Sequence, residues 1–445
     1  MQNWVSLYKY GNVMVRLSLI SLFITLAYIP SFSQQVLPSK DQIAWADAEM
    51  GVIIHLDINI FAPETFDYKK KETLPDLSIF HPSKLNTDQW VKTAKAAGAK
   101  YAVLTVKHGT GFCLWPSAVN DYNVGHTPYK KDILQDFIAS CKKYGLRPGL
   151  YYNTNTNTYY GTHDEAYTKA VLAQLNELWS NYGPMFEIWF DGGLQNGLEA
   201  DVLKMIHDKQ PQAILFQGPL KAGNTIRWIG NEDGFAAYPQ WSRANETTAS
   251  DGTVKIDGLH GDPEGKYWCP GESDFPIRRN YAWNGGWLWK AGEDKDLFSV
   301  KELMEKYYKS VGRNTNMLVG MVVDTSGLIP KADSLVFDSL GHRLKQVFSA
   351  PLAVRNNLTQ SIIEFGNKTG KAASQIMIME DLEYGENILA YSLQAMIGDK
   401  WKEVATGESV GHKRIQTFSP VNAEQWRLMI TGNAGPLHIR KVALY

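Results

Sequence analysis

The stretch NTDQWVKTAKAAGAKYAVLTVKH, residues 86–108, predicts a helix that is followed by a buried strand. An Asn or a Thr can cap the helix, its apolar residues recur at helical spacing, and Gly98 can end it. The apolar run after the helix is rich in β-branched residues, which favours a strand, and it ends on His108. A similar run, GVIIHL at residues 51–56, precedes the helix. The two runs and the helix between them predict one βα unit of a parallel sheet.

The same alternation of strand and helix recurs to about residue 320. Helices are expected in KKDILQDFIASCKKYG, DEAYTKAVLAQLNELWSNYG, ADVLKMIHDKQP and SVKELMEKYYKSVGRN, and strands in RPGLYYN, MFEIWFDGG, AILFQG, TIRWIGNE and NMLVGMVV. Seven or eight such units predict the α/β class and a (β/α)8 barrel. An open doubly wound sheet is the alternative, but no glycine-rich phosphate loop follows the first strand.

A second domain is expected after the barrel, because 445 residues exceed what one hydrophobic core usually serves. From about residue 351, short alternating segments separated by Gly, Asn, Asp and Pro predict an antiparallel β-sandwich. We therefore expect a signal peptide over 1–33, a (β/α)8 catalytic domain over 34–350 and a β-sandwich over 351–445.

The N-terminus has the pattern of an export signal. Lys9 and Arg16 precede the apolar stretch LSLISLFITLAYIP, and Ser31 and Ser33 are small residues of the kind that a signal peptidase reads. The stretch is short for a membrane span, and no cysteine follows it to carry a lipid. We expect cleavage near Ser33 and an exported protein, periplasmic or secreted, without a membrane anchor.

Composition gives no indication of several other classes of protein. The formal charge is -1 and no block of like charges is present, so nothing favours nucleic acid or an anionic membrane as a partner. Three cysteines, Cys113, Cys141 and Cys269, are too few and too scattered for a disulfide framework or a zinc site, and we expect buried thiols. No cofactor and no metal are expected.

Polar or charged residues stand near the ends of several predicted strands, where a barrel carries its catalytic groups. Each of them alone is explained by a structural role, but together they predict a polar site at one end of the barrel. Trp189 lies two residues before Asp191 on the same strand and should face the same side. The residues are His55, His108, Tyr151, Asp191, Arg227 and Glu232.

An Asp and a Glu in an aromatic pocket suit the hydrolysis of glycosidic bonds. In that chemistry one ionised carboxylate attacks the anomeric carbon, and a protonated one donates to the leaving oxygen. Aromatic walls help to raise the pKa of the acid. His and Tyr side chains would then bind the sugar hydroxyls.

Several segments together resemble the α-L-fucosidases of glycoside hydrolase family 29. In chain order they are GVIIH, WVKTAKAAGAKYAVLTVKHGTGFCLWPS, GLRPGLYYN, EIWFDGG, IRWIGNE, YYKSVGRNTNMLVG and GLIP, and the resemblance covers roughly residues 45 to 345. It implies a retaining exo-α-L-fucosidase that removes terminal fucose from oligosaccharides or glycoconjugates, with Asp191 as the nucleophile. IRWIGNE resembles the branch that prefers α1,3/1,4-linked fucose, which implies Glu232 as the acid/base. Glu272, in WCPGESDFPIR, is the rival.

The chain also departs from the family pattern. His55 is followed by Leu56 and Asp57 where the family commonly has His-Trp-Gly, and Gly109 stands where it has a second His. The family's Glu-Trp loop pair is absent, and Glu64 is the nearest candidate. Two alternatives therefore stay open: a glycosidase on the same scaffold that prefers a galactose-like sugar, and a sugar-binding protein without catalysis.

Overall fold

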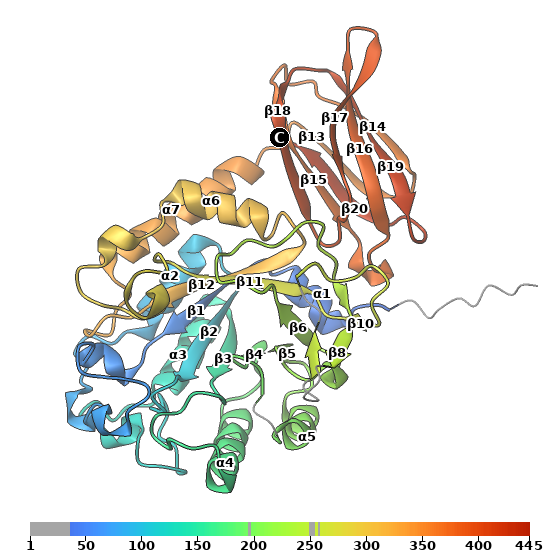
Figure 1. The fold of residues 1–445 in the computed structure, drawn as a ribbon. Coiled ribbons are helices and arrows are strands. Elements are labelled where there is room, and N and C mark those ends of the chain that lie inside the picture. Colours follow the sequence, from blue (N-terminus) through green and yellow to red (C-terminus); the bar gives the residue numbers. More distant parts are fainter. Residues whose placement is uncertain (1–35, 195–196, 249–253, 257–258) are drawn as a thin grey trace, which may run out of the picture. The chain divides into compact units, whose positions relative to one another are not determined.

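Eight parallel strands close into a barrel in the computed structural model, which describes residues 36–194, 197–248, 254–256 and 259–445. The expected signal peptide, residues 1–33, lies outside these described residues. Within them, no helix is both long and apolar enough to cross a membrane. The barrel and the antiparallel sheets that follow it in the chain confirm the expected fold class (Figure 1).

The barrel strands neighbour one another in chain order, and the first strand pairs with the last to close the sheet. Because all of them run parallel, their carboxyl ends lie at the same end of the barrel. The strands are β1 (Met50–His55), β2 (Tyr101–Lys107), β3 (Arg147–Tyr152), β4 (Glu187–Trp189), β5 (Ile214–Phe216), β6 (Thr225–Trp228), β11 (Gly271–Pro276) and β12 (Thr315–Val322).

An α-helix follows each of β1 to β4 and each of β11 and β12, which gives most of the barrel its regular βα pattern. A short additional helix, α1 (Lys40–Ala46), precedes β1. The helices after the strands are α2 (Thr87–Ala97), α3 (Ile133–Tyr144), α4 (Glu165–Asn181), α5 (Glu199–Lys209), α6 (Val300–Lys309) and α7 (Lys331–Phe348).

Helix α2 forms for the reasons that its sequence suggests. The Asn86 side chain accepts a hydrogen bond from the backbone N–H of Gln89, and Gly98 ends the helix with a φ of 102°. Trp90 and Ala94 are among the buried residues of the face toward the core. The cap, the apolar face and the final glycine together explain why α2 forms between β1 and β2.

The regular pattern breaks after β5 and β6. Only the 3-10 helix η5 (Leu220–Ala222) joins β5 to β6, within the described residues. Between β6 and β11 lie two small antiparallel sheets, formed by β7 (Arg243–Ala244) with β10 (Tyr267–Trp268) and by β8 (Glu246–Thr248) with β9 (Val254–Ile256). Strand β11 was not among the expected strands because its sequence, GESDFP, carries three polar residues instead of an apolar run.

The barrel interior is filled by side chains that alternate with outward-facing ones along each strand. One buried cluster includes the inward-facing Tyr101, Tyr151, Trp189 and Phe216, and Trp189 stacks on Phe216 with ring centroids 3.7 Å apart. The larger cluster, which contains Trp90, lies between strands and helices. The inner cluster forms the floor beneath the carboxyl ends of the strands.

Two four-stranded antiparallel sheets follow α7 and form the expected sandwich, with a separate core around Tyr391 and Trp426. Buried and exposed side chains alternate along β14 (Ile362–Gly366), because one face of its sheet packs on the other sheet. One sheet has the order β13 (Ala353–Leu358), β20 (Ile439–Leu444), β15 (Ala373–Glu380) and β18 (Arg414–Val421), and the other has the order β14 (Ile362–Gly366), β19 (Gln425–Asn433), β16 (Ile388–Ile397) and β17 (Lys400–Gly407).

Candidate active site

Four aromatic side chains meet at the carboxyl ends of the first four barrel strands. His55 is the last residue of β1, His108 directly follows β2, Tyr151 lies near the end of β3, and Trp189 ends β4. Ring centroids of His108 and Tyr151 are 5.8 Å apart, and those of Tyr151 and Trp189 are 5.4 Å apart. His55 lies edge-on to Tyr151 at 6.0 Å. The structure therefore brings these four predicted residues together.

Asp191 lies just beyond the end of β4 and is held by side chains from β3 and the loop after it. The Tyr151 hydroxyl donates a 2.6 Å hydrogen bond to Oδ2 of Asp191, and Nδ2 of Asn153 donates to the same oxygen at 3.2 Å. Burial raises the pKa of Tyr151 well above its ordinary value, and the Asp191 charge adds to this. The phenol thus stays protonated and acts as the donor, which orients one oxygen of Asp191.

The loop after β3 is fixed by a buried lysine that sequence reasoning missed. Lys107 donates from Nζ to the backbone oxygen of Asn153 at 2.7 Å, and its ammonium lies 4.4 Å from the centroid of the Tyr152 ring. Burial lowers the pKa of Lys107 to about 8. The Asn153 side chain in turn accepts from the backbone N–H groups of Asn155 and Thr156. Asn153 is therefore held from both sides while it donates to Asp191.

His108 receives a hydrogen bond from Tyr68, which lies on the loop after β1. The Tyr68 hydroxyl accepts from Nδ2 of Asn59 and from Nδ2 of Asn284, each at 2.9 Å. With both acceptor sites used, its own hydrogen points to Nδ1 of His108, 3.2 Å away. Burial lowers the pKa of His108 to about 4, although Asp191 acts in the opposite direction. The imidazole is therefore neutral at pH 7 and carries its hydrogen on Nε2.

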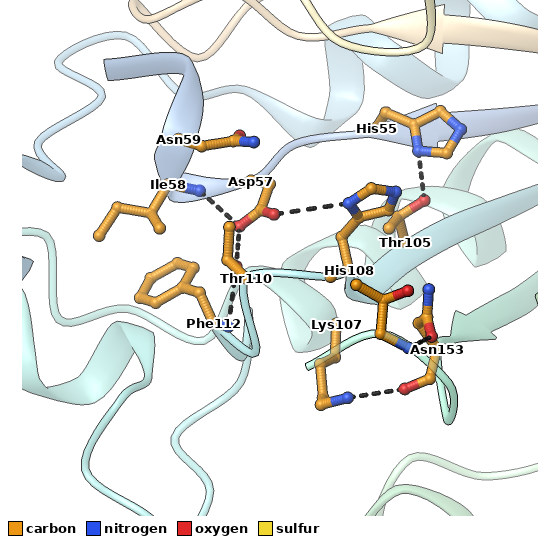
Figure 2. Close-up of polar contacts among 12 residues, drawn as sticks. His55, Asp57, Ile58, Asn59, Thr105, Lys107, His108, Thr110, Phe112 and Asn153 are labelled. Carbon is orange, nitrogen blue, oxygen red and sulfur yellow. Dashed lines mark hydrogen bonds and ion pairs between the residues drawn. The ribbon is translucent and has the colours of Figure 1, made fainter. Parts of the chain in front are cut away.

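Asp57 is a second carboxyl close to His108, and sequence reasoning did not place it in the site. Its Oδ1 accepts from the Thr110 hydroxyl at 2.6 Å and from the backbone N–H of Ile58 at 2.7 Å, and its Oδ2 lies 3.7 Å from Nδ1 of His108. Figure 2 shows the Asp57 carboxyl between Thr110 and His108. Burial raises the pKa of Asp57 to about 7, against the effect of these hydrogen bonds.

The position of Asp57 could have been found from its place in the sequence. It directly follows Leu56 after β1 and caps the 3-10 helix η1 (Ile58–Phe61) with its side chain. A polar residue just past the end of a barrel strand satisfies the same criterion that selected His55 and His108. The departure from the family pattern at Asp57 therefore marked a residue of the site.

His55 presents one ring nitrogen that makes no hydrogen bond within the described residues. Its Nδ1 is 2.8 Å from the Thr105 hydroxyl, whereas Nε2 is buried and has no protein partner there. Burial lowers the pKa of His55 well below its ordinary value, and the nearby His108 adds to this. The ring also lies edge-on to Trp287 at 5.2 Å. His55 is thus a neutral side chain with a free polar atom next to the aromatic cluster.

Glu232 lies on the loop after β6 and is exposed. Its Oε2 accepts a 3.0 Å hydrogen bond from Nε1 of Trp287, which lies just after the 3-10 helix η6 (Trp283–Gly286). Because Trp287 also contacts His55, it links Glu232 to the aromatic cluster that holds Asp191. Sequence reasoning missed Trp287, whose loop carries no periodic pattern.

Glu272 occupies a different environment inside the barrel. It lies within β11, is fully buried, and accepts hydrogen bonds from the Tyr101 hydroxyl at 2.7 Å and from Nε1 of Trp189 at 3.0 Å. Burial raises the pKa of Glu272 and, more strongly, that of Glu187, its equally buried neighbour, which the Glu272 charge raises further. Two such carboxyls stay close only if one of them keeps its proton. Glu272 thus orients the Trp189 ring from inside the barrel.

Asp274, two residues along β11 from Glu272, is a third carboxyl in this region that sequence reasoning did not select. It is buried, and burial raises its pKa well above the ordinary value, with the charges of Glu232 and Glu272 adding to the effect. Asp274 is therefore a neutral acid beside Glu232. Asp274 was not selected because β11, with its polar residues, was not recognised as a strand.

Two predicted residues are not brought to the aromatic cluster. Arg227 was expected at the mouth of the barrel, but its guanidinium donates to the backbone oxygens of Cys269 and Trp241 instead. The reason is the alternation of β6: Ile226 belongs to the barrel interior, so Arg227 points outward. Glu64 is largely exposed and pairs with Lys290 at 2.8 Å, without a hydrogen bond or ion pair to the cluster in the described part of the chain. The placement of Arg227 corrects the sequence-based expectation, whereas the role of Glu64 in sugar binding stays a prediction.

The described residues contain no group of three His, Cys, Asp or Glu side chains that could hold a metal ion. The three cysteines are buried and unpaired. What the barrel presents at the carboxyl ends of its strands is a carboxylate held by a phenol, neutral imidazoles, indole rings and a second, exposed carboxylate. This is the arrangement of a glycoside hydrolase of the (β/α)8 class.

Comparison with known proteins identifies the family within that class. The chain belongs to the α-L-fucosidase family, whose model matches residues 41–347. Alpha-L-fucosidase 1 of Arabidopsis thaliana is 30% identical over 434 residues, which cover 86% of this chain and 82% of that protein. The family resemblance that the sequence motifs indicated is thus confirmed.

Solved structures agree with this assignment. A protein of Bacteroides thetaiotaomicron is 33% identical and superposes with a TM-score of 0.85, covering 93% of this chain and 99% of its own. A glycoside hydrolase 29 family member from an unknown rumen bacterium is 27% identical with a TM-score of 0.80, covering 92% of this chain and 77% of its own. The likeness extends through the sandwich as well as the barrel.

Proposed function

We propose that this protein is an exported, retaining exo-α-L-fucosidase that removes terminal fucose, α1,3- or α1,4-linked, from oligosaccharides or glycoconjugates. The observation that carries the proposal is the pair of donors on Asp191, because a carboxylate held by Tyr151 and Asn153 is oriented for attack. Family membership supports fucose as the sugar. Release of fucose from a Lewis-type trisaccharide by the purified protein tests the proposal.

The proposed reaction has two steps. An oxygen of Asp191 attacks the anomeric carbon while Glu232 donates its proton to the departing glycosidic oxygen, which leaves a fucosyl ester on Asp191. Glu232 then takes a proton from water, the water oxygen attacks the same carbon, and the carboxylate of Asp191 leaves. Fucose is released with its original configuration. No cofactor takes part in either step.

The environments of the two glutamates support Glu232 as the acid/base over Glu272. Glu232 is exposed and linked through Trp287 to the cluster that contains His55, so a substrate oxygen can reach its carboxyl. Glu272 is fully buried and has hydrogen-bond donors on both oxygens. A proton shuttle that must meet substrate and water is better served by an open carboxyl.

The two histidines are proposed to bind sugar hydroxyls. Nε2 of His55 makes no hydrogen bond within the described residues, and Nε2 of His108 carries the hydrogen in the tautomer that Tyr68 selects. Both rings are neutral, so they can accept or donate a hydrogen bond without a buried positive charge.

One observation favours a shifted sugar specificity as the second candidate. A Cβ atom added at Gly109 would lie 2.8 Å from Cε1 of Tyr68, so the Tyr68 ring fills the space next to the position where the family pattern has a second His. A phenol in place of an imidazole changes which hydroxyls can be bound. Rates measured on aryl α-L-fucosides and on aryl glycosides of galactose separate the two candidates, and sugar binding without hydrolysis of either would favour the non-catalytic alternative.

Export is proposed from the N-terminal pattern of charge, apolar stretch and small residues. Expression of the full chain in a Gram-negative host, fractionation and N-terminal sequencing of the product test it. A periplasmic or secreted protein whose chain begins just after Ser33 is expected. A cytoplasmic product that still carries its first residues would overturn this part of the proposal.

A further inference from the structure

An open cavity of about 410 Å³ lies beside Glu232, among the loops after β6 and β11 and the start of α6. Its walls combine apolar rings with side chains that hydrogen-bond. Tyr281 is exposed, with 71% of its surface open to solvent. The residues that line the cavity include Glu232, Phe235, Arg279, Tyr281, Phe298 and Glu302.

We propose that this cavity is a binding site for a neutral sugar of the leaving group, with Tyr281 as the ring on which that sugar stacks. The inference rests on the proposed function, because the roles of Asp191 and Glu232 decide on which side the leaving group lies. Glu232 lines the cavity and also accepts from Trp287, which contacts His55. A sugar attacked by Asp191 lies on the His55 side, so the group whose oxygen Glu232 protonates departs on the cavity side.

The walls of the cavity suit a carbohydrate. The guanidinium of Arg279 lies 5.0 Å from the centroid of the Phe298 ring and is bonded to Glu302 at 2.9 Å, so both side chains are held in place. Apolar rings can receive the C–H face of a pyranose, and carboxylates and amides can bind its hydroxyls. The volume falls within the range of about 300 to 1,000 Å³ that is usual for ligand sites.

The charges of the walls favour a neutral sugar over an acidic one. Arg278 forms two hydrogen bonds with the buried Asp333, Arg279 pairs with Glu302, and Lys306 donates to the backbone oxygen of Asp233. Each cation of the cavity thus already has an oxygen partner. Asp233 adds negative charge at the rim, which disfavours a sulfated or sialylated leaving group.

The loop that carries Glu232 is braced, which keeps the cavity formed. Nδ2 of Asn231 donates to the backbone oxygen of Phe235 at 3.1 Å, and Oδ1 of Asn231 accepts from the backbone N–H of Asp233 at 3.0 Å. Gly234 has a φ of 69°, and a Cβ atom there would lie 2.4 Å from the Phe275 ring. The loop therefore packs closely on β11, with Glu232 at its outer edge.

The test compares Tyr281→Ala with Leu335→Ala, which removes an exposed apolar side chain from α7. For each variant, kcat/KM is measured on an aryl α-L-fucoside and on a fucosylated neutral trisaccharide. Tyr281→Ala should lower the trisaccharide value about tenfold more than the aryl value, as expected for one lost aromatic contact, and Leu335→Ala should lower neither selectively. A trisaccharide in which the leaving sugar is sulfated should be a poorer substrate of the native protein. Equal effects of Tyr281→Ala on both neutral substrates, or no effect, would overturn the proposal.

A second measurement separates this site from the proposed function. Binding of the free neutral disaccharide N-acetyllactosamine is followed by saturation-transfer NMR, which requires no hydrolysis. If the protein hydrolyses no fucoside, binding that Tyr281→Ala abolishes would support the cavity as a sugar site while the proposed function fails. In that case, a lack of binding, or binding that Tyr281→Ala leaves intact, would overturn the site.

Discussion

The hydroxyl of Tyr151 donates a 2.6 Å hydrogen bond to Oδ2 of Asp191 from the neighbouring barrel strand. We predict that Tyr151→Phe lowers kcat/KM on fucosides by roughly 10- to 100-fold, because a hydrogen bond to a charged group contributes about 1.5 to 3 kcal/mol. The loss should appear mainly in kcat, since the nucleophile is affected. Tyr152→Phe is the matched control: Tyr152 follows on the same strand and donates to Gln174 at 2.6 Å, on the side away from Asp191. Similar losses of activity in the two variants would contradict the assigned role.

Tyr68 selects the tautomer of His108, which yields a spectroscopic prediction. In the native protein, ¹⁵N NMR should show the His108 hydrogen on Nε2, and Tyr68→Phe should leave a mixture of tautomers and reduce kcat/KM by about tenfold. Tyr122→Phe provides the control, because it removes a buried hydroxyl that donates to the backbone oxygen of Pro75 at 3.0 Å. A hydrogen on Nδ1 of His108 in the native protein would refute the assignment.

Asp57 should make the stability of the protein depend on pH. Its pKa is raised to about 7 in the folded state, against about 3.9 when unfolded, so between these values the unfolded chain releases a proton that the folded chain keeps. The free energy of unfolding therefore falls as pH rises from about 4 to 7, by roughly 4 kcal/mol at most. Asp57→Asn keeps an acceptor for Thr110 and removes this loss. Urea unfolding at pH 4.5 and 7.5 should show a stabilisation by Asp57→Asn that is larger at pH 7.5.

A surface carboxylate serves as the reference for that measurement. The pKa of Asp76 is lowered by its hydrogen bond with Ser78, so Asp76→Asn should bring no stabilisation that grows with pH. An equal gain from Asp57→Asn at both pH values would show that Asp57 is not protonated in the folded protein at neutral pH.

The two glutamates should differ in how replacement depends on the leaving group. Glu232→Ala should reduce hydrolysis of natural oligosaccharides by about 100-fold or more, and aryl fucosides with a good leaving group by much less, because these need little protonation. Azide should partly restore the second step on the aryl substrates. Glu272→Ala should instead lower thermal stability, since Tyr101 and Trp189 would lose their acceptor. Selective loss and azide rescue in Glu272→Ala, and not in Glu232→Ala, would reverse the assignment.

Sequence reasoning reached most of the barrel because its strands and helices carry patterns that packing imposes. The βα unit at residues 86–108 has a cap, an apolar face, a terminating glycine and a β-branched run, and each element forms where these signals lie. Strand β11 was not predicted because it carries Glu272 and Asp274, which are buried in the structure. A strand with buried acidic residues lacks the apolar pattern by which strands are predicted. Interior polar residues of this kind are stabilised by partners far away in the chain.

The site divides in the same way between residues on strands and residues on loops. His55, His108, Tyr151 and Asp191 could be predicted because parallel strands bring their carboxyl ends together. Tyr68 and Trp287 come from irregular loops, and their places depend on tertiary contacts that the sequence does not display. Arg227 shows a different error: its strand was recognised, but the period of two that turns Ile226 inward and Arg227 outward was not applied.

The most direct test of the account is to trap the covalent intermediate on the protein. The reagent 2-deoxy-2-fluoro-α-L-fucosyl fluoride reacts slowly in both chemical steps, so incubation with it should leave one fluorofucosyl group on the protein. Peptide mass spectrometry then locates this group. We predict a single ester on Asp191, with no labelling and no fucose release in Asp191→Asn. An adduct on any other carboxylate, or turnover of fucosides by the native protein without an adduct, would contradict the assignment of Asp191 as the nucleophile.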